Sequence, residues 1–394
     1  MSWTGGWRPR TTRWWRGSPA SVPADRYDAD LTIAWGERAR QAMAEHAEIL
    51  RDCLGEAAGD LLPLVEDKLG REPIEDLRID FEDGYGVRGD DVEDADVGRA
   101  AEALAAAQRS RATSALPPSY GIRFKSFERP TRSRGLATLV GFVDRLLSSG
   151  GRLDGFVVTL PKVTSVAQVE AMAVACDRIE GAHGLSRGTL RFEIQVETPQ
   201  SILGPDGTAL VARMIQAAPE RVSGLHYGTY DYSAFCGIAA AYQSLEHPVA
   251  DHAKAVMQAA AAGTGVRLSD GSTNILPVGD AEEVRRGWAL HLRLVRRSLE
   301  RGFYQGWDLH PAQLPTRYAA TYAFYRDGFA SAAERLRRYA TGSGGGVLDE
   351  PATARALADF LVRGLDCGAL HDHETDATGM DRAALTALAR PVRS

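Results

Sequence analysis

The sequence predicts an α/β protein built on a (β/α)8 TIM barrel, with an N-terminal helical extension and a small C-terminal helical appendage. Two observations predict the barrel. Between residues 77 and 310, seven segments have the pattern of strands and most are followed by a helix. Nearly every one of these segments also ends in a charged residue. This rhythm fits a closed barrel, with one strand not located, better than an open six-stranded sheet.

The expected strands can be read in order along the chain. They lie in the segments LRIDFEDG (77–84), SYGIRFKSF (119–127), DGFVVTLPKV (154–163), LRFEIQVETP (190–199), VSGLHYGTYDYS (222–233), VRLSDGS (266–272) and FYQGWDLHPAQL (303–314). Among the helices between them, one is marked at both ends. Asp280 and Glu283 form a capping-box pattern before its apolar stripe, and Gly302 is placed to end it.

The same pattern divides the 394 residues into four parts. Residues 1–30, rich in Trp and Arg, are expected to be a flexible tail rather than a contact for membrane or RNA. A helical extension is expected over residues 31–75 and the catalytic barrel over residues 76–330. Residues 331–394 are expected to form the appendage, in which the Gly-rich stretch at 341–351 is a linker or loop.

The composition narrows the classes of function. The net charge of −6 gives no global attraction to nucleic acid or to a membrane surface. No apolar run is long enough to span a bilayer, and the first thirty residues lack the apolar segment of a secretory signal. The four cysteines are far apart, which is typical of free thiols in a reducing cytoplasm. A Walker A motif for nucleotide binding does not occur in the sequence.

The charged strand ends define the candidate site, because the carboxyl ends of barrel strands converge on one mouth. Buried charges cost several kcal/mol unless they are paired or bind a metal, so such a rim is expected to hold an ion. Carboxylates on adjacent strands, with no paired His or Cys nearby, suit Mg²⁺ or Mn²⁺. Glu197 and Asp231 are therefore the expected metal ligands. The alternative is that Glu197 belongs to a structural ion-pair network with Arg123 or Lys162. The residues of the rim are Asp80, Glu82, Asp83, Arg123, Lys125, Lys162, Glu197, Asp231, Asp270, Asp308 and His310.

Two further residues fit the binding of an anionic substrate. Arg123 is expected to point into the barrel, where its fork of donors suits a carboxylate or an enolate oxygen. Gly228 would let backbone N–H groups approach a small anion. A Schiff base on Lys125 or Lys162 is disfavoured because neighbouring acids hold a lysine protonated. The His-rich stretch 370–376 is expected to be a solvated loop rather than a zinc site.

Six segments in this order resemble the citrate lyase β-subunit/HpcH–HpaI aldolase family, which shares its barrel with malate synthase. They span roughly residues 75–315. The segments are IDFEDGYG, GIRFKSF, TLPKV, QVETP, YGTYDYS and GWDLHPAQ.

The resemblance implies a set of roles. Glu197 and Asp231 would bind Mg²⁺, Arg123 would hold substrate oxygens, and the backbone around Gly228, Thr229, Tyr230 and Asp231 would take the carboxylate of a 2-oxo acid. Asp80, Glu82 and Asp83 would shape the surroundings of the metal, and Lys162 matches the family's Leu-Pro-Lys segment. These four residues and Arg123 are the expected catalytic residues. The resemblance implies an enzyme with a small-molecule substrate.

The expected activity is that of a Mg²⁺-dependent carbon–carbon lyase. It would cleave a hydroxy acid or hydroxyacyl-CoA through a metal-stabilised enolate, with pyruvate or glyoxylate as product. The alternatives are a malate synthase-like acyltransferase that condenses glyoxylate with an acyl-CoA, and a barrel kept as a non-catalytic scaffold. A homo-oligomer is expected by analogy with relatives of this type.

Overall fold

The computed structural model describes residues 19–110, 116–342 and 350–390. Its centre is one sheet of eight parallel strands in the order β1 to β8. A further parallel bridge joins Ala20 in β1 to Asp308, just after β8, and closes the sheet into a barrel. The strands are β1 (Pro19–Pro23), β2 (Asp76–Asp80), β3 (Ser119–Arg123), β4 (Phe156–Leu160), β5 (Arg191–Val196), β6 (Val222–Tyr227), β7 (Arg267–Asp270) and β8 (Gln305–Gly306).

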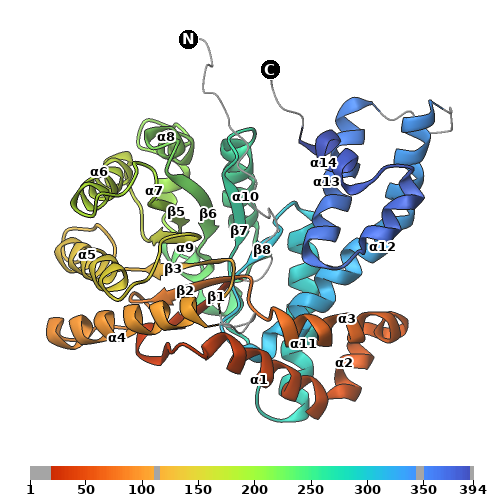
Figure 1. Ribbon diagram of the computed structural model, residues 1–394, viewed down its shortest axis with the longest axis horizontal. Helices are drawn as coiled ribbons and strands as arrows, with labels where there is room; N and C mark the ends of the chain where they lie inside the picture. The colour runs from red at the N-terminus through yellow and green to blue at the C-terminus, as the bar shows by residue number, and fades with distance from the viewer. Residues whose placement is uncertain (1–18, 111–115, 343–349, 391–394) are drawn as a thin grey trace.

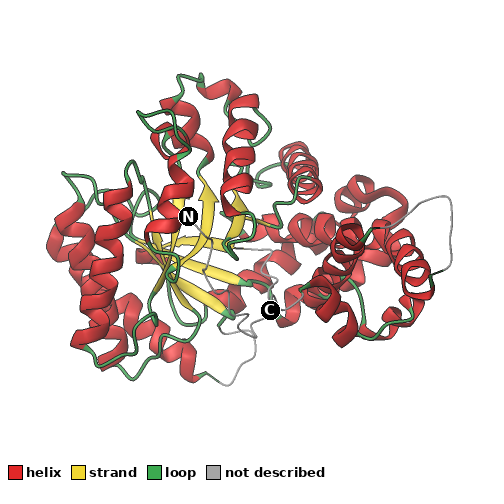
Figure 2. Cartoon of the chain, turned by 90° about the horizontal axis from the view of Figure 1, so that it is seen from above, coloured by secondary structure: helices red, strands yellow, loops and turns green. Residues whose placement is uncertain are grey.

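Helices surround the barrel and extend to one side of it (Figure 1). In Figure 2, the strands lie at the centre of the larger part of the molecule, and the C-terminal helices stand beside it. The helices are α1 (Leu31–Glu45), α2 (Ala47–Leu54), α3 (Ala58–Arg71), α4 (Asp90–Arg109), α5 (Arg132–Ser148), α6 (Val166–Ala182), α7 (Pro199–Ile202), α8 (Leu210–Ala217), α9 (Thr229–Phe235), α10 (Pro248–Ala261), α11 (Ala281–Glu300), α12 (Leu314–Thr341), α13 (Pro351–Cys367) and α14 (Arg382–Ala389).

The strand that the sequence pattern did not locate is β1. It lies at residues 19–23, within the part of the chain expected to be a flexible tail, and its two prolines and small residues hide the strand pattern. The barrel therefore begins before the helical extension. Helices α1, α2 and α3 are an insertion between β1 and β2, divided at His46 and at Gly55, whose φ is +58°. Residues 1–18 lie outside the described residues.

Two other expected boundaries differ in the structure. The predicted strand at 222–233 ends at Tyr227, so Asp231 lies in the first turn of α9 rather than on a strand. Helix α12 runs without interruption across position 330, where the barrel was expected to end, because this stretch contains no helix-breaking residue pair. Asp280 and Glu283 do cap α11 through a reciprocal capping box, as predicted.

Buried charges in the barrel interior are paired. Glu193 accepts a hydrogen bond from Arg78 (2.6 Å), and His226 lies 2.7 Å from the same carboxylate oxygen. Arg78 also pairs with Asp76, and all of these side chains are buried. The charge of Glu193 is therefore balanced by neighbouring side chains inside the barrel.

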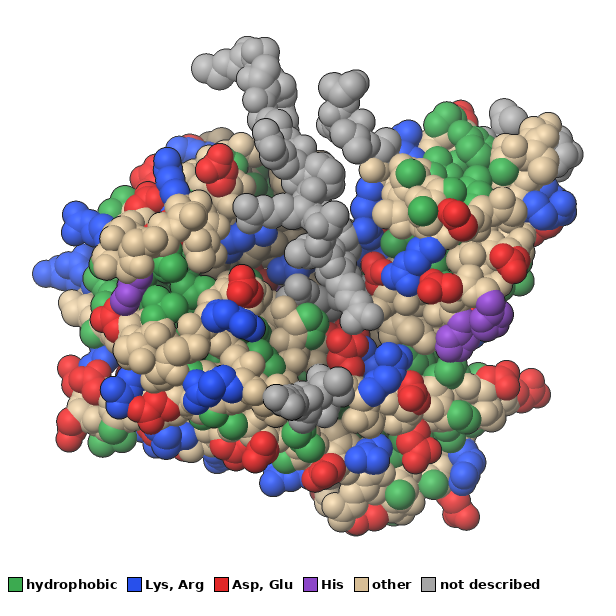
Figure 3. Space-filling view, viewed as in Figure 1, with side chains coloured by type: hydrophobic (Ala, Val, Ile, Leu, Met, Phe, Trp, Pro, Cys, Tyr) green, Lys and Arg blue, Asp and Glu red, His purple; other side chains and the backbone are tan. Residues whose placement is uncertain are grey.

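Surface charges are mixed in sign. On the face in Figure 3, acidic and basic side chains of the described residues are interspersed. Among the described helices, none combines the length and apolar character needed to cross a bilayer.

Candidate metal and substrate site

Arg123 at the end of β3 is held by Asp80 at the end of β2. Its Nε and Nη2 atoms donate to the two oxygens of Asp80 at 2.7 and 2.6 Å. The same oxygens accept from the backbone N–H groups of Glu82 and Gly84. Asp80 is 1% exposed, so its carboxylate fixes Arg123 and the turn after β2 and does not reach the mouth. The sequence had grouped Asp80 with the catalytic residues, whereas its contacts are those of an anchor.

The remaining edge of Arg123 faces the site. Its Nη1 atom lies 3.5 Å from Glu82 Oε2 and 3.4 Å from Gln195 Oε1. One edge of the guanidinium is therefore committed to Asp80, and the other is directed toward the mouth, where it can donate to a further oxygen.

Glu197, which directly follows β5, is completely buried, and each of its carboxylate oxygens accepts a hydrogen bond. The backbone N–H of Lys162 donates to its Oε1 at 2.7 Å, and the Nε2 atom of Gln195 donates to its Oε2 at 2.6 Å. Gly228 leaves the space for this side chain, because a Cβ at that position would lie 2.9 Å from Glu197 Oε2. Neighbouring groups thus fix the orientation of the carboxylate.

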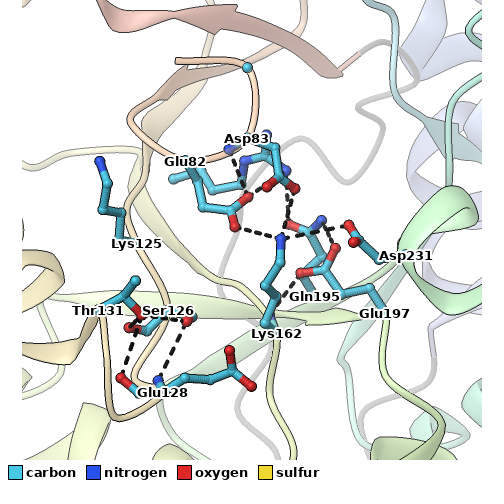
Figure 4. Close-up of polar contacts among 12 residues, drawn as sticks. Glu82, Asp83, Lys125, Ser126, Glu128, Thr131, Lys162, Gln195, Glu197 and Asp231 are labelled. Carbon is cyan, nitrogen blue, oxygen red and sulfur yellow. Dashed lines mark hydrogen bonds and ion pairs between the residues drawn. The ribbon is translucent and has the colours of Figure 1, made fainter. Parts of the chain in front are cut away.

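Lys162 has an unusual backbone. Its φ is +50°, and it is the one non-glycine residue with a positive φ in the described part of the chain. A left-handed conformation costs a side-chain-bearing residue on the order of 1–2 kcal/mol, and such strain is concentrated at functional sites. Here the conformation directs the N–H group to Glu197 while the side chain reaches the acids across the mouth (Figure 4).

Three carboxylates converge beside Lys162. Asp83, Glu197 and Asp231 each offer an oxygen within 4.8 Å of the others, and they form the one group of potential metal ligands in the described residues. The sequence predicted two of them as ligands and placed Asp83 only in the surroundings. Asp83 follows β2 in the acidic run FED, and the turn held by Asp80 carries it to the other two.

The site holds more acid than base. Five carboxylates (Asp80, Glu82, Asp83, Glu197 and Asp231) gather with two cations (Arg123 and Lys162), which leaves an excess of three negative charges when all are ionised. All donor atoms of the convergent trio are carboxylate oxygens, the set that a hard divalent cation prefers. The residues present therefore fit Mg²⁺ or Mn²⁺.

The charge excess alters the pKa values of the acids. Burial raises the pKa of Glu82 to about 7, although Arg123 and Lys162 oppose the shift. Burial likewise raises the pKa of Glu197 well above its ordinary value, with Glu82 and Asp231 acting in the same direction. Burial alone would lower the pKa of Lys162, but its carboxylate neighbours raise it. A protonated amine is not a nucleophile, so the raised pKa of Lys162 disfavours a Schiff base there.

The segment after β6 contributes less directly than predicted. The N–H of Gly228 donates to the carbonyl of Val196 between β6 and β5, so it is not free for an anion. The hydroxyl of Thr229 donates to the carbonyl of Ser272, and Tyr230 accepts from the N–H of Asn274 at 2.6 Å. These two side chains join α9 to the loop after β7. Of the four predicted substrate-binding residues in this segment, Asp231 is the one whose side chain lies in the acidic group.

Several other charged candidates have structural partners. Lys125 pairs with Glu93, Asp270 with Lys254, and Asp308 with Arg317 and His291. His310 caps the turn at Pro311–Gln313 through its Nδ1 atom. In the C-terminal His-rich segment, Glu374 closes a capping box with His371 and pairs with Arg326. The sequence could not assign these partners because most come from distant helices.

Comparison with family models gives one match. The model of a family described as Domain of unknown function (DUF6986) matches residues 19–393. No curated protein sequence matches the chain.

Comparison with solved structures shows where the fold recurs. Malate synthase from Haloferax volcanii, in a magnesium/glyoxylate complex, superimposes with a TM-score of 0.52 at 15% identity, covering 94% of this chain and 90% of that one. The protein CitE from Mycobacterium tuberculosis, in complex with magnesium, acetoacetate and coenzyme A, gives a TM-score of 0.51 at 18% identity, covering 94% and 100%. At these identities, the likeness shows a shared fold.

Proposed function

We propose that this chain, which belongs to the DUF6986 family, is a Mg²⁺-dependent carbon–carbon lyase that cleaves a hydroxy acid or hydroxyacyl-CoA and releases a 2-oxo acid. The observation that carries the proposal is the convergence of Asp83, Glu197 and Asp231, with the Nη1 edge of Arg123 directed toward the same mouth. Glu197 and Asp231 would hold the cation, with Asp83 as a third carboxylate. The bound cation would supply Lewis-acid polarisation of a substrate carbonyl oxygen.

The residues around this position favour chemistry that develops negative charge on oxygen. Arg123 stays protonated, and its Nη1 edge can donate to a substrate oxygen next to the acidic group. Asp80 keeps the guanidinium plane fixed through two hydrogen bonds, so little reorganisation is needed when charge develops. Cleavage of a carbon–carbon bond next to a carbonyl produces an enolate, which is a charge of this kind.

The substrate would be a small anion. Residues Thr229–Asp231 form the first turn of α9, where backbone N–H groups lack intrahelical acceptors and can take a carboxylate. Support for substrate class also comes from the fold, since the CitE protein with this barrel was solved with acetoacetate and coenzyme A. A homo-oligomer remains part of the proposal by analogy.

A malate synthase-like condensation is the second candidate. The chain superimposes on Haloferax malate synthase as well as on CitE, and each match covers 94% of the chain. The same cation and Arg123 would then serve an acyl-CoA and glyoxylate.

Proton NMR of pyruvate in D₂O tests the proposal. With Mg²⁺, the lyase is expected to exchange the methyl protons and deplete their signal, and excess chelator is expected to stop the exchange. If pyruvate does not exchange, the next assay supplies glyoxylate and acetyl-CoA. Its readout is the release of free thiol. Consumption of acetyl-CoA would favour the synthase, and failure of both assays would favour the non-catalytic scaffold.

A further inference from the structure

We propose that the ammonium group of Lys162 is a tethered competitor of the divalent cation. It balances the acidic site while no cation is bound, and it leaves Asp83 and Asp231 when a cation binds. The inference rests on the proposed cation site and goes beyond it, because it makes Lys162 the residue that sets the affinity of that site. Lys162 is in this sense a positioning residue and not a catalytic one.

The position of the ammonium group carries the inference. Lys162 Nζ lies 2.8 Å from Asp83 Oδ2 and 3.6 Å from Asp231 Oδ2. These are two of the three carboxylates that converge as candidate ligands. A divalent cation would draw the same oxygens to about 2.0–2.6 Å. The ammonium group and the cation therefore compete for one set of lone pairs, and they repel each other as like charges.

The backbone explains why this lysine cannot simply move away. Its N–H donates to Glu197, and its left-handed φ of +50° fixes the direction in which the side chain leaves the chain. Only side-chain rotation remains available. The ammonium group is thus kept within reach of the acids in every state in which Glu197 keeps its orientation.

Glu82 provides the position to which the ammonium group can withdraw. Its Oε1 atom lies 2.5 Å from Lys162 Nζ, and Glu82 is not one of the three convergent ligands. When Asp83 and Asp231 turn to a cation, Lys162 can keep this ion pair and stay neutralised. In Figure 4, the Lys162 side chain extends toward Glu82 and Asp83, with Asp231 on its other side.

A competing role and a supporting role for Lys162 predict opposite effects on cation affinity when its ammonium group is removed. If Lys162 only supported the geometry of the ligands, its loss would weaken cation binding. A competitor behaves in the opposite way, because its removal leaves the acids unpaired and ready for a cation. Lys162→Met keeps the chain length and the backbone N–H while removing the ammonium group.

The experiment measures Mn²⁺ affinity by the loss of the free-ion electron paramagnetic resonance signal. Wild type, Lys162→Met and a second variant, Lys162→Gln, are titrated at one pH and ionic strength. Both variants are expected to bind Mn²⁺ about tenfold more tightly, the scale of one close charge–charge interaction. Arg129→Met is the matched control, since Arg129 is an exposed cation on the loop after β3. The Arg129→Met protein is expected to bind Mn²⁺ with the affinity of wild type.

The outcomes separate this inference from the proposed function. Tighter binding by the Lys162 variants alone supports the competitor. Equal or weaker binding by these variants, with wild type binding normally, overturns it and leaves the cation site intact. Absence of Mn²⁺ binding in all proteins overturns the cation site and the inference with it.

As a second readout, the chelator-treated Lys162→Met protein is expected to melt below wild type, and Mg²⁺ is expected to raise its melting temperature by more than that of wild type.

Discussion

Gly228 lies directly against Glu197, and the two residues are side by side because β6 pairs with β5. A Cβ on residue 228 would lie 2.9 Å from Glu197 Oε2 and closer still to Glu197 Cβ, which is part of the fixed base of the side chain. The role of this glycine is therefore to admit a carboxylate and not to offer its N–H to a ligand.

Gly228→Ala is expected to displace Glu197 and to lower the free energy of unfolding by about 1–3 kcal/mol, the usual cost of forcing extra atoms into a packed site. Mg²⁺ affinity is expected to fall with it, because the carboxylate loses its two fixed donors. Calorimetric titration with Mg²⁺ and urea unfolding measure the two effects. Gly98→Ala, in an open part of α4, is the control and is expected to keep or raise stability. Unchanged Mg²⁺ affinity in Gly228→Ala would contradict the role assigned to Glu197.

Glu197→Gln removes the charge of the central carboxylate and keeps its size. The variant is expected to bind Mg²⁺ at least about 100-fold more weakly, since even residues that only orient a ligand contribute 10–100-fold. Calorimetric titration gives the affinity directly. Glu220→Gln makes the same chemical change at an exposed residue before β6, at the opposite end of the barrel, and is expected to bind Mg²⁺ like wild type.

The stability of the cation-free protein is expected to depend on Glu82. Because its pKa is raised to about 7 from 4.5, the folded protein keeps a proton that the unfolded chain releases between these pH values. The free energy of unfolding therefore falls as the pH rises through this window, by up to about 3 kcal/mol from this group. Glu197, whose pKa is also raised, acts in the same direction.

Urea unfolding of the chelator-treated protein between pH 5 and pH 8 checks this prediction. Glu82→Gln is expected to flatten the decline, and wild type in Mg²⁺ is expected to recover most stability at the upper end of the range. A variant with the same pH slope as wild type would show that Glu82 ionises normally.

The strained backbone at Lys162 makes a prediction that concerns stability alone. Lys162→Gly and Lys162→Ala both lose the side chain and keep the N–H that binds Glu197, but only glycine adopts a φ of +50° without strain. The glycine variant is therefore expected to be more stable than the alanine variant by about 1 kcal/mol. Urea unfolding of the pair measures the difference. Greater stability of the alanine variant would mean that the left-handed conformation is not kept in solution.

The sequence was sufficient to predict a barrel of parallel strands and the charged residues that follow several of them, because both depend on local patterns. Alternating apolar residues place Ile194 and Val196 on one face and Glu193 and Gln195 on the other, and the strand end then places Glu197 at the mouth. The prediction failed where the signal is not local. β1 has five residues, two of them proline, and it is a strand because β2 and the segment after β8 pair with it.

The roles of the rim residues were harder to predict than their positions. Asp80 and Asp83 are three residues apart in one acidic run, yet one is a buried anchor for Arg123 and the other reaches the convergent trio. That difference arises from the turn between them, whose N–H groups bond to Asp80. The left-handed backbone of Lys162 has no sequence signal, since lysine has no preference for that conformation.

Arg123→Lys tests whether the guanidinium edge that faces the mouth takes part in the reaction. Arginine donates to both oxygens of Asp80 and still directs Nη1 toward Glu82 and Gln195. A lysine has one compact ammonium group, so it can satisfy Asp80 or reach the mouth, but not both. The rate of Mg²⁺-dependent pyruvate exchange is expected to fall about 100-fold, the effect of losing one donor to a developing oxyanion.

Mn²⁺ affinity is expected to stay close to that of wild type, because Arg123 is not among the convergent carboxylates. Arg145→Lys, in an exposed ion pair with Glu102, controls for the substitution itself. A normal exchange rate in Arg123→Lys would restrict Arg123 to anchoring the turn after β2, and the charge developed in the reaction would then need another partner at the mouth.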